Sequence, residues 1–251
     1  MLKEVDFYFF SPTGGTKKTG GILAYEIAET VNEINLAEKA IGNPSSDVVI
    51  VAAPVFGGRI PALVSEKLAK LSGEGKKAIT IAVYGVRAYE DALLELNDVM
   101  KNSGFEVAAS AALIAQHSIV PEVGAGRPDD ADTAEIRSFA KRILGAIEGG
   151  KTGEFTVPGN RPYKDGMKVT STPISLPECS GCGYCERICP TDAIALADGG
   201  IATDVSKCIM CMACAANCHV KARILPPQLQ EALSQKLSAC RDVRRENEFF
   251  E

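Results

Sequence analysis

The chain has 251 residues, of which 46% are hydrophobic and 24% are charged, a composition typical of a folded globular protein with room for two domains. Its 32 acidic and 27 basic side chains give a net charge of −5, which argues against a general nucleic-acid binder, because such proteins need a basic face. No apolar run reaches the roughly 18 residues of a membrane span, and the first residues do not form a signal peptide. The sequence therefore predicts a cytoplasmic protein without a membrane span.

Residues 1–150 repeat one local pattern, in which a short apolar run is followed by a loop and then by a helical pattern. The later apolar runs are continuous rather than alternating, which is typical of parallel strands that are buried on both faces. The pattern therefore predicts an α/β fold with a parallel five-stranded sheet between two layers of helices. The predicted strands are 3–10, 31–36, 47–53, 77–84 and 105–115, and the predicted helices are 20–31, 61–71, 89–102 and 129–148.

The loops at the carboxyl ends of such strands are the candidate binding segments, because ligands of parallel sheets bind at that edge. The first loop, Ser11–Thr16, reads SPTGGT, and its hydroxyls and glycine amides suit a phosphate at the start of a helix. It lacks the Gly-x-x-x-x-Gly-Lys-Ser/Thr pattern of nucleoside-triphosphate loops. Loops 54–61 and 84–91 each combine glycine and arginine with an aromatic residue that can stack on a planar ring. The alternative interpretation is an ordinary helix cap and three core aromatics, Phe56, Tyr84 and Tyr89.

The loop SPTGGT after the first strand resembles the phosphate loop of flavodoxins, which has the form Ser/Thr-x-Thr-Gly-x-Thr. This resemblance implies that residues 1–150 form a flavodoxin-like, doubly wound domain that binds FMN. The phosphate would lie on the first loop, and the isoalloxazine ring would lie between the other two. The residues that the resemblance places around FMN are Ser11, Thr13, Gly14, Gly15, Thr16, Pro54, Val55, Phe56, Gly57, Gly58, Tyr84, Gly85, Arg87 and Tyr89.

Two arginines distinguish the ring loops from those of many flavodoxins, which surround the flavin with acidic side chains. Arg59 and Arg87 predict a positive environment that stabilises a reduced, anionic flavin. They could equally be solvated charges or contacts to a second domain. His117, after the fifth predicted strand, is either a proton donor near the ring or a loop histidine with a structural hydrogen bond.

Residues 151–175 are rich in Gly, Pro, Thr and Lys and show no sustained periodicity, which predicts an inter-domain linker long enough to wrap around one domain. The segment that follows contains eight of the nine cysteines, in two copies of C-x-x-C-x-x-C-x-x-x-C. A cysteine at every third residue lets one tight loop present three thiolates to an iron-sulfur cubane, while the fourth cysteine reaches the other cluster. Zinc sites favour paired Cys-x-x-Cys knuckles instead.

Residues 176–226 resemble bacterial two-cluster ferredoxins, which implies a small α+β ferredoxin-like domain with two [4Fe-4S] clusters. In that arrangement the first cluster is held by Cys179, Cys182, Cys185 and Cys218, and the second by Cys208, Cys211, Cys214 and Cys189. His219 stands where a second proline is usual. Residues 227–251 are predicted to be an amphipathic C-terminal helix, with Cys240 as a buried thiol on its apolar stripe.

The complete pattern resembles the ferredoxin-flavodoxin fusion proteins of anaerobic bacteria and archaea. This resemblance implies an electron-transfer iron-sulfur flavoprotein that passes electrons between two [4Fe-4S] clusters and FMN and serves a redox partner protein. The alternative is an FMN-dependent oxidoreductase that reduces a small-molecule electron acceptor, such as a quinone or unsaturated compound. A sensing module is the least supported interpretation, because no regulatory or nucleic-acid-binding stretch is present. The linker leaves open whether electron transfer occurs within one chain or across a homodimer.

Overall fold

A computed structural model describes residues 1–150, 153–197 and 200–251 of the chain. The first domain has a parallel sheet with the strand order β2-β1-β3-β4-β5, which is the flavodoxin-like order and confirms the predicted fold class. Its strands are β1 (Leu2–Phe9), β2 (Ala28–Asn35), β3 (Val48–Pro54), β4 (Lys77–Tyr84) and β5 (Glu106–Ile114). Its helices are α1 (Gly15–Ile27), α2 (Ala62–Leu68), α3 (Ala92–Asn102) and α4 (Asp130–Glu148).

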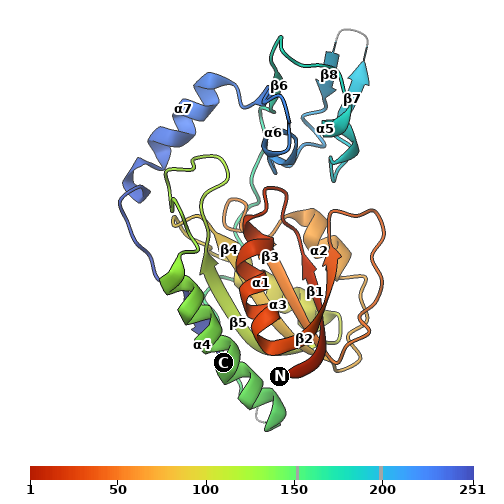
Figure 1. Ribbon diagram of the computed structural model, residues 1–251, viewed down its shortest axis with the longest axis vertical. Coiled ribbons are helices and arrows are strands. Elements are labelled where there is room, and N and C mark those ends of the chain that lie inside the picture. The colour runs from red at the N-terminus through yellow and green to blue at the C-terminus, as the bar shows by residue number, and fades with distance from the viewer. Residues whose placement is uncertain (151–152, 198–199) are drawn as a thin grey trace.

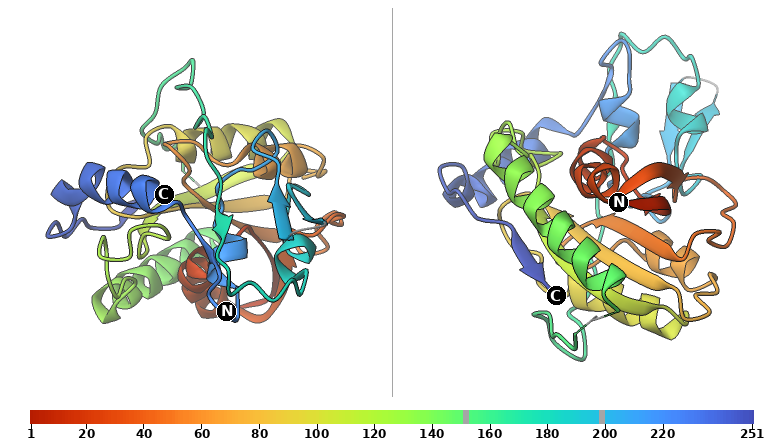
Figure 2. Two further views of the ribbon diagram at one scale, coloured as in Figure 1. Left: turned by 90° about the horizontal axis from the view of Figure 1, so that it is seen from above. Right: turned by 60° about the horizontal axis from the view of Figure 1, so that its bottom comes forward.

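Helices cover both faces of this sheet, α1 and α4 on one side and α2 and α3 on the other (Figure 1, Figure 2). The central strands are buried throughout, as continuous apolar runs predict. Helix α1 lies very close to the sheet at Gly20, where a Cβ atom would stand 2.9 Å from Cβ of Ala52. Within the described ranges, no helix is both long enough and apolar enough to cross a membrane.

A sixth strand, β10 (Glu248–Phe250), pairs antiparallel with β5, so the predicted helix over 227–251 is wrong beyond its first ten residues. The helix α7 spans Pro227–Lys236 and is followed by a single 3₁₀ turn at Ser238–Cys240. Phe249 packs into the core on the α1 and α4 side of the sheet, whereas Phe250 packs on the opposite side. Consecutive side chains that enter opposite cores require a strand, which explains why the chain cannot remain helical here.

The cysteine-rich segment forms a small α+β domain above the carboxyl ends of the parallel strands (Figure 1). Strands β6 and β9 pair antiparallel, and β7 and β8 form a hairpin. The short helices α5 and α6 begin 29 residues apart, which is the spacing of the two cysteine motifs. The bounds are β6 (Ile174–Ser175), α5 (Tyr184–Arg187), β7 (Ile194–Ala197), β8 (Gly200–Thr203), α6 (Ala213–Ala216) and β9 (Arg223–Ile224).

The segment before this domain wraps along α3. The backbone amides of Asn160 and Lys164 donate to the Asp91 carboxylate over 2.8 and 2.7 Å. The Arg161 guanidinium pairs with Asp98 at an N–O distance of 2.6 Å. Hydrogen bonds to Asp91 lower the pKa of its carboxyl, although burial opposes this effect. Residues 153–173 of the predicted linker therefore form a strap on the first domain, whereas residues 151–152 lie outside the described residues.

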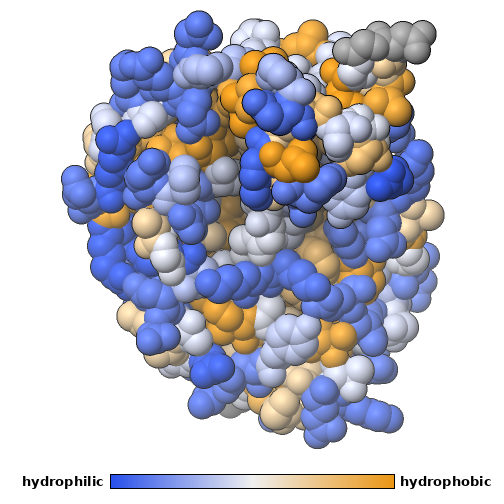
Figure 3. All heavy atoms as spheres, turned by 45° about the horizontal axis from the view of Figure 1, so that its top comes forward, coloured by the Kyte–Doolittle hydropathy of each residue, from blue (hydrophilic) through white to orange (hydrophobic). Residues whose placement is uncertain are grey.

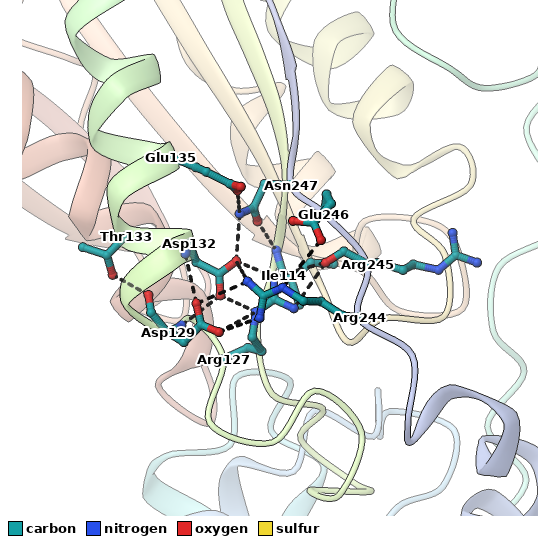
Figure 4. Close-up of polar contacts among 10 residues, drawn as sticks. All are labelled: Ile114, Arg127, Asp129, Asp132, Thr133, Glu135, Arg244, Arg245, Glu246 and Asn247. Carbon is teal, nitrogen blue, oxygen red and sulfur yellow. Dashed lines mark hydrogen bonds and ion pairs between the residues drawn. The ribbon is translucent and has the colours of Figure 1, made fainter.

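The segment after α7 is fastened to the first domain by a buried polar cluster (Figure 4). The Asn247 side chain accepts a hydrogen bond from the Ile114 amide and donates one to Asp132, each over 2.9 Å. Asp132 also forms a buried ion pair with Arg127, whose guanidinium donates to the Arg245 carbonyl over 3.2 Å. The cysteine-rich domain is thus connected to the first domain by ordered chain on both sides.

Candidate functional site

A hollow of about 740 Å³, including its open mouth, lies where the loops after β1, β3, β4 and β5 meet the cysteine-rich domain. Nine of the fourteen residues predicted around FMN line it, namely Thr13, Gly15, Thr16, Pro54, Val55, Phe56, Gly57, Tyr84 and Gly85. The structure therefore brings all three predicted loops together at one edge of the sheet.

The first loop has the features of an anion site at a helix start. The Ser11 hydroxyl accepts a hydrogen bond from the Lys17 amide over 2.9 Å, which fixes the turn. Gly14 takes the left-handed conformation, with φ of +90°, immediately before α1 begins at Gly15. The first turn of α1 contains no acidic side chain that would compete for its positive dipole end. Ser11 and Gly14 shape this loop, whereas Thr13, Gly15 and Thr16 line the hollow.

The two ring loops provide aromatic walls. A tight turn closes between Phe56 and Arg59, with the Phe56 amide donating to the Arg59 carbonyl over 2.9 Å. The Phe56 ring lies edge-on to Phe10, and Tyr84 lies edge-on to Tyr89, with ring centroids 5.3 Å apart in the second pair. Burial raises the pKa of the Tyr84 hydroxyl to about 12, so it stays protonated as a donor.

The two arginines of these loops are not lining residues of the hollow, and both are paired with carboxylates. Arg59 binds Glu95 with two N–O distances of 2.7 Å and also donates to the Lys164 carbonyl. Arg87 pairs with Glu90, with an N–O distance of 3.0 Å. Neither is a lining residue of the hollow, although the Arg87 charge acts on His117, which lines it, so the predicted effect of the two arginines on the flavin stays a prediction. Gly58 and Tyr89 also lie outside the lining, and the Tyr89 hydroxyl donates to Glu248 over 2.7 Å.

The loop after β5 contributes His117, which lines the hollow. Its Nδ1 atom accepts hydrogen bonds from the amides of Ile119 and Val120 over 3.2 and 3.1 Å. Burial, and secondarily the Arg87 charge, lowers the pKa of His117, which favours the neutral ring. Because Nδ1 accepts, the proton of the neutral ring lies on Nε2, which has no hydrogen-bond partner among the described residues. Gly85 permits this approach, since a Cβ atom there would lie 2.7 Å from Cβ of His117.

Three further lining residues come from outside residues 1–150. Met167, in the strap, lies at the mouth of the hollow, where its Cβ atom would stand 3.1 Å from a Cβ added at Gly57. Met210 and Cys211 belong to the second cysteine motif. Local sequence patterns contain no signal for these three, because only the docking of two domains brings them to the FMN loops.

The cysteines predicted to hold the second cluster line one common cavity, namely Cys189, Cys208, Cys211 and Cys214. Backbone amides point at two of their sulfurs, Ala193 at Cys189 over 3.3 Å and Met210 at Cys208 over 3.4 Å. Burial raises the pKa of the Cys211 thiol to about 12, and neighbouring cysteines add to the effect. A positively charged iron core would counter this cost and stabilise the thiolates.

The cysteines predicted to hold the first cluster differ in their exposure. Cys185 is buried and packs beside Cys189 and Cys214, so the two predicted sets adjoin, whereas Cys182 is exposed. His219, at the usual proline position, is exposed as well. In the ranges that the structure describes, no three Cys, His, Asp or Glu side chains are grouped to hold one metal ion. Cysteines that bind separate irons of a cubane stand farther apart than ligands of one ion, and the assignment of this set stays a prediction.

The fit of an anionic cluster can be tested on the one buried guanidinium of this domain, Arg223, which is 3% exposed. Its Nε atom is buried and has no hydrogen-bond partner in the described chain. Its Nη2 atom lies 4.0 Å from Sγ of Cys214. A buried cation without a carboxylate is costly unless another anion is close. A cluster of thiolates and sulfides is such an anion, so these residues fit [4Fe-4S] chemistry.

The two domains meet directly at the hollow. The Asn217 side chain donates to the Pro12 carbonyl over 3.2 Å, which ties α6 to the first loop. Ile209 and Cys211 pack against the core group that includes Phe56. On the far side of the cysteine-rich domain, exposed apolar side chains gather over the end of the molecule seen in Figure 3. The exposed large apolar residues of this domain include Ile174, Tyr184, Leu196, Val205 and Val220, of which Val205 lines a groove beside Phe56.

Comparison with known proteins agrees with this architecture. Residues 173–219 match the family model described as a 4Fe-4S dicluster domain. A curated relative, an uncharacterised ferredoxin of Methanocaldococcus jannaschii, is 36% identical over 78 residues, which cover 31% of this chain. The chain spans about half the length of that relative, since the match covers 48% of it.

Similar solved structures include a flavodoxin of Streptococcus pneumoniae TIGR4 (19% identity, TM-score 0.41, covering 57% of this chain and 98% of that one). Another is a flavodoxin from the domain Archaea (15% identity, TM-score 0.41, covering 58% and 99%). The assignment of the first domain rests on its observed strand order. The chain therefore joins a flavodoxin-like α/β domain to a C-terminal 4Fe-4S dicluster ferredoxin domain.

Proposed function

We propose that this protein is an electron-transfer iron-sulfur flavoprotein that passes electrons between its [4Fe-4S] clusters and FMN within one chain. The observation that carries this proposal is the position of Cys211. This residue lines the cavity of four cysteines and also the hollow formed by the three FMN loops. One ligand of the second cluster would thus stand at the wall of the flavin site. The two domains alone suggest electron transfer, and this shared wall supports transfer between them.

The residues available for each group follow from the lining of the two cavities. Thr13, Gly15 and Thr16 would hold the FMN phosphate, and Phe56 and Tyr84 would lie beside its ring. Clusters supply one-electron carriers, whereas FMN can hold one or two electrons, so together they couple one-electron and two-electron chemistry. Because all these residues belong to one chain, the proposed transfer does not require a homodimer.

The partner is proposed to exchange electrons at the cysteine-rich domain rather than at the flavin. Met167, Met210 and Cys211 line the hollow from the side of the second domain and its strap, where they would limit the approach of another protein. Cys182, in contrast, is exposed, and the apolar residues Tyr184 and Leu196 near it are 40% and 50% exposed. Exposed apolar side chains beside a cluster ligand suit a transient redox contact.

The second candidate is an FMN-dependent oxidoreductase that reduces a quinone or another small unsaturated acceptor. One observation favours it. The Nε2 atom of His117, which lines the hollow, carries the ring proton and has no partner in the described chain. Such a donor could hydrogen-bond an acceptor's carbonyl oxygen. The neighbouring groove, which shares Phe56 and Met167 with the hollow, offers a route by which a small molecule could enter.

An anaerobic reductive titration of the full chain tests the proposal. The protein is loaded with iron, sulfide and FMN, and is followed by absorbance and EPR at a dilution at which it is monomeric. We expect about eight iron atoms per chain, as two [4Fe-4S] clusters require, and reduction of the bound FMN by electrons that enter through the clusters. Loaded clusters that fail to reduce bound FMN in the monomer would overturn the proposal. Anaerobic turnover of a quinone by the same sample would favour the oxidoreductase.

A further inference from the structure

Arg223 is a buried arginine of the ferredoxin domain that has no carboxylate partner among the described residues. It is 3% exposed, at the start of β9. Its Nη1 atom donates to the Ser175 hydroxyl over 3.1 Å, and its Nη2 atom donates to the Thr203 hydroxyl over 2.9 Å. None of the ion pairs in the described chain includes it, and its buried Nε atom has no partner there. A full positive charge is therefore held inside this domain by neutral groups only.

The internal repeat of the domain shows that this position does not require a cation. Arg223 follows Cys218 by five residues, and Ile194 follows Cys189 by the same interval in the first motif. Ile194 is also buried, 6% exposed, and packs against Cys185 and Cys214. The fold thus accepts an aliphatic side chain at the equivalent place, so packing alone does not explain the arginine.

The charge lies beside cysteines of both predicted sets. The Nη2 atom of Arg223 is 4.0 Å from Sγ of Cys214, which belongs to the second set. Arg223 also lines a hollow together with Cys179, of the first set. In the described part of the chain, Cys214 is the one cysteine that accepts a hydrogen bond from this guanidinium, so the second set receives the strongest interaction.

We propose that Arg223 is a potential-tuning residue, whose buried charge and hydrogen bond raise the reduction potential of the cluster that Cys214 helps to hold. A positive charge favours the more negative, reduced form of a cluster, and hydrogen bonds to the ligand sulfurs act in the same direction. The second cluster, at the wall of the flavin hollow, then becomes a better electron acceptor than the first. This inference rests on the proposed function and adds a direction of electron transfer to it, from the first cluster, which has the exposed ligand Cys182, toward the flavin.

Three variants of the full chain test the inference, each loaded with iron, sulfide and FMN and titrated anaerobically with EPR detection. Arg223→Ile copies the residue at the equivalent repeat position, Arg223→Gln keeps a hydrogen-bond donor without the charge, and Arg223→Lys keeps the charge. We expect the midpoint potential of the second cluster to fall in the first two variants and to stay near the wild-type value in the third. Lys221→Gln is the matched control, because it removes an exposed charge from the same loop.

Each outcome separates this inference from the proposed function. Unchanged potentials in Arg223→Ile and Arg223→Gln, with wild-type iron and sulfide content, would overturn the inference alone. An equal fall in Lys221→Gln would also overturn it, since any nearby charge would then suffice. Loss of iron from all three Arg223 variants but not from wild type would assign Arg223 a structural role instead. Failure of the wild-type protein to bind clusters or FMN would overturn the proposed function itself.

Discussion

The side-chain amide of Asn217 donates a hydrogen bond to the backbone carbonyl of Pro12, over 3.2 Å and across the domain boundary. Asn217 directly precedes Cys218, and Pro12 lies within the predicted phosphate loop. The same amide group also donates to the Ala213 carbonyl over 2.9 Å, which holds it at the end of α6. This contact links the position of the ferredoxin domain to the conformation of the FMN phosphate loop.

Replacing Asn217 with Ala should therefore weaken FMN binding without removing either cofactor. A neutral hydrogen bond contributes about 0.5–1.5 kcal/mol, which corresponds to a rise of roughly 2- to 13-fold in the FMN dissociation constant. Fluorescence titration of the apoflavin protein with FMN measures this constant. Gln235→Ala, on the exposed part of α7, is the control. Equal FMN affinities in the two variants would show that the contact does not support the loop.

His117 allows its two ring nitrogens to be tested separately. His117→Asn places an amide oxygen near the Nδ1 position, so it can still accept from the amides of Ile119 and Val120 while losing the distal donor. His117→Gln places an amide N–H₂ near the Nε2 position instead. If the free Nε2–H contacts the flavin, we expect Asn, but not Gln, to shift the FMN midpoint potential and visible absorbance. Identical spectra and potentials for wild type and His117→Asn would contradict this role.

The lowered pKa of His117 also predicts an acid-sensitive stability. The unfolded ring takes up a proton near pH 6.5, whereas the folded ring resists it, so the unfolded state binds more protons below that pH. The contribution of this residue to the free energy of unfolding is therefore present above about pH 6.5 and is lost as pH falls through the lowered pKa. Urea unfolding of the clusterless protein between pH 5 and 8 measures it, and His117→Asn should flatten that part of the profile.

Apolar periodicity and loop chemistry were sufficient to predict the parallel sheet, since β3 and β4 are continuously buried runs. Helix α1 begins five residues earlier than its apolar pattern, because Gly14 turns the chain and the hydroxyl-rich segment is already helical. The tail was misassigned because α7 continues the leucine stripe, whereas the strand is defined by only two phenylalanines that enter opposite cores. Long-range pairing with β5 decides that segment, and no local pattern encodes it.

The sequence predicts those parts of the candidate site whose functional residues lie together in one loop. It does not predict contacts between residues that are far apart in the sequence. The SPTGGT loop and the spacing of the cysteines indicate their ligands directly. The sequence, in contrast, suggests that Arg59 contacts the flavin ring. The structure pairs Arg59 with Glu95 and with the Lys164 carbonyl of the strap. Met167 and Cys211 line the hollow only because the two domains dock. Both residues are far from the FMN loops in the sequence, so no local pattern predicts that they lie there.

Alkaline conditions should destabilise the flavodoxin-like domain through its buried tyrosines. Burial is the main cause that raises the pKa of Tyr84 to about 12, and the same cause raises the pKa of Tyr8 to about 12. Because the pKa of each tyrosine is higher in the folded than in the unfolded state, its contribution to the free energy of unfolding is complete below about pH 10. This contribution is lost as the pH rises to about 12. Two pKa units correspond to about 3 kcal/mol for each residue. Tyr84→Phe should reduce the slope of unfolding free energy against pH in this range, and an unchanged slope would contradict the assignment.

The last prediction concerns the polar cluster that fastens the C-terminal segment. Asn247→Ala would leave the buried Ile114 amide without its acceptor and Asp132 without one donor, which should cost about 1–3 kcal/mol of the free energy of unfolding. Glu246→Gln is the matched control, because Glu246 is exposed and its pair with Arg244 is worth at most about 1 kcal/mol.

Release of the tail would also free one of the two connections of the ferredoxin domain, so Asn247→Ala should slow electron transfer from the clusters to FMN at constant cluster content. Stopped-flow reduction under anaerobic conditions measures that rate, and urea unfolding measures the stability. A loss of stability without slower transfer would show that the strap of residues 153–173 and the contact between Asn217 and Pro12 suffice to dock the two domains.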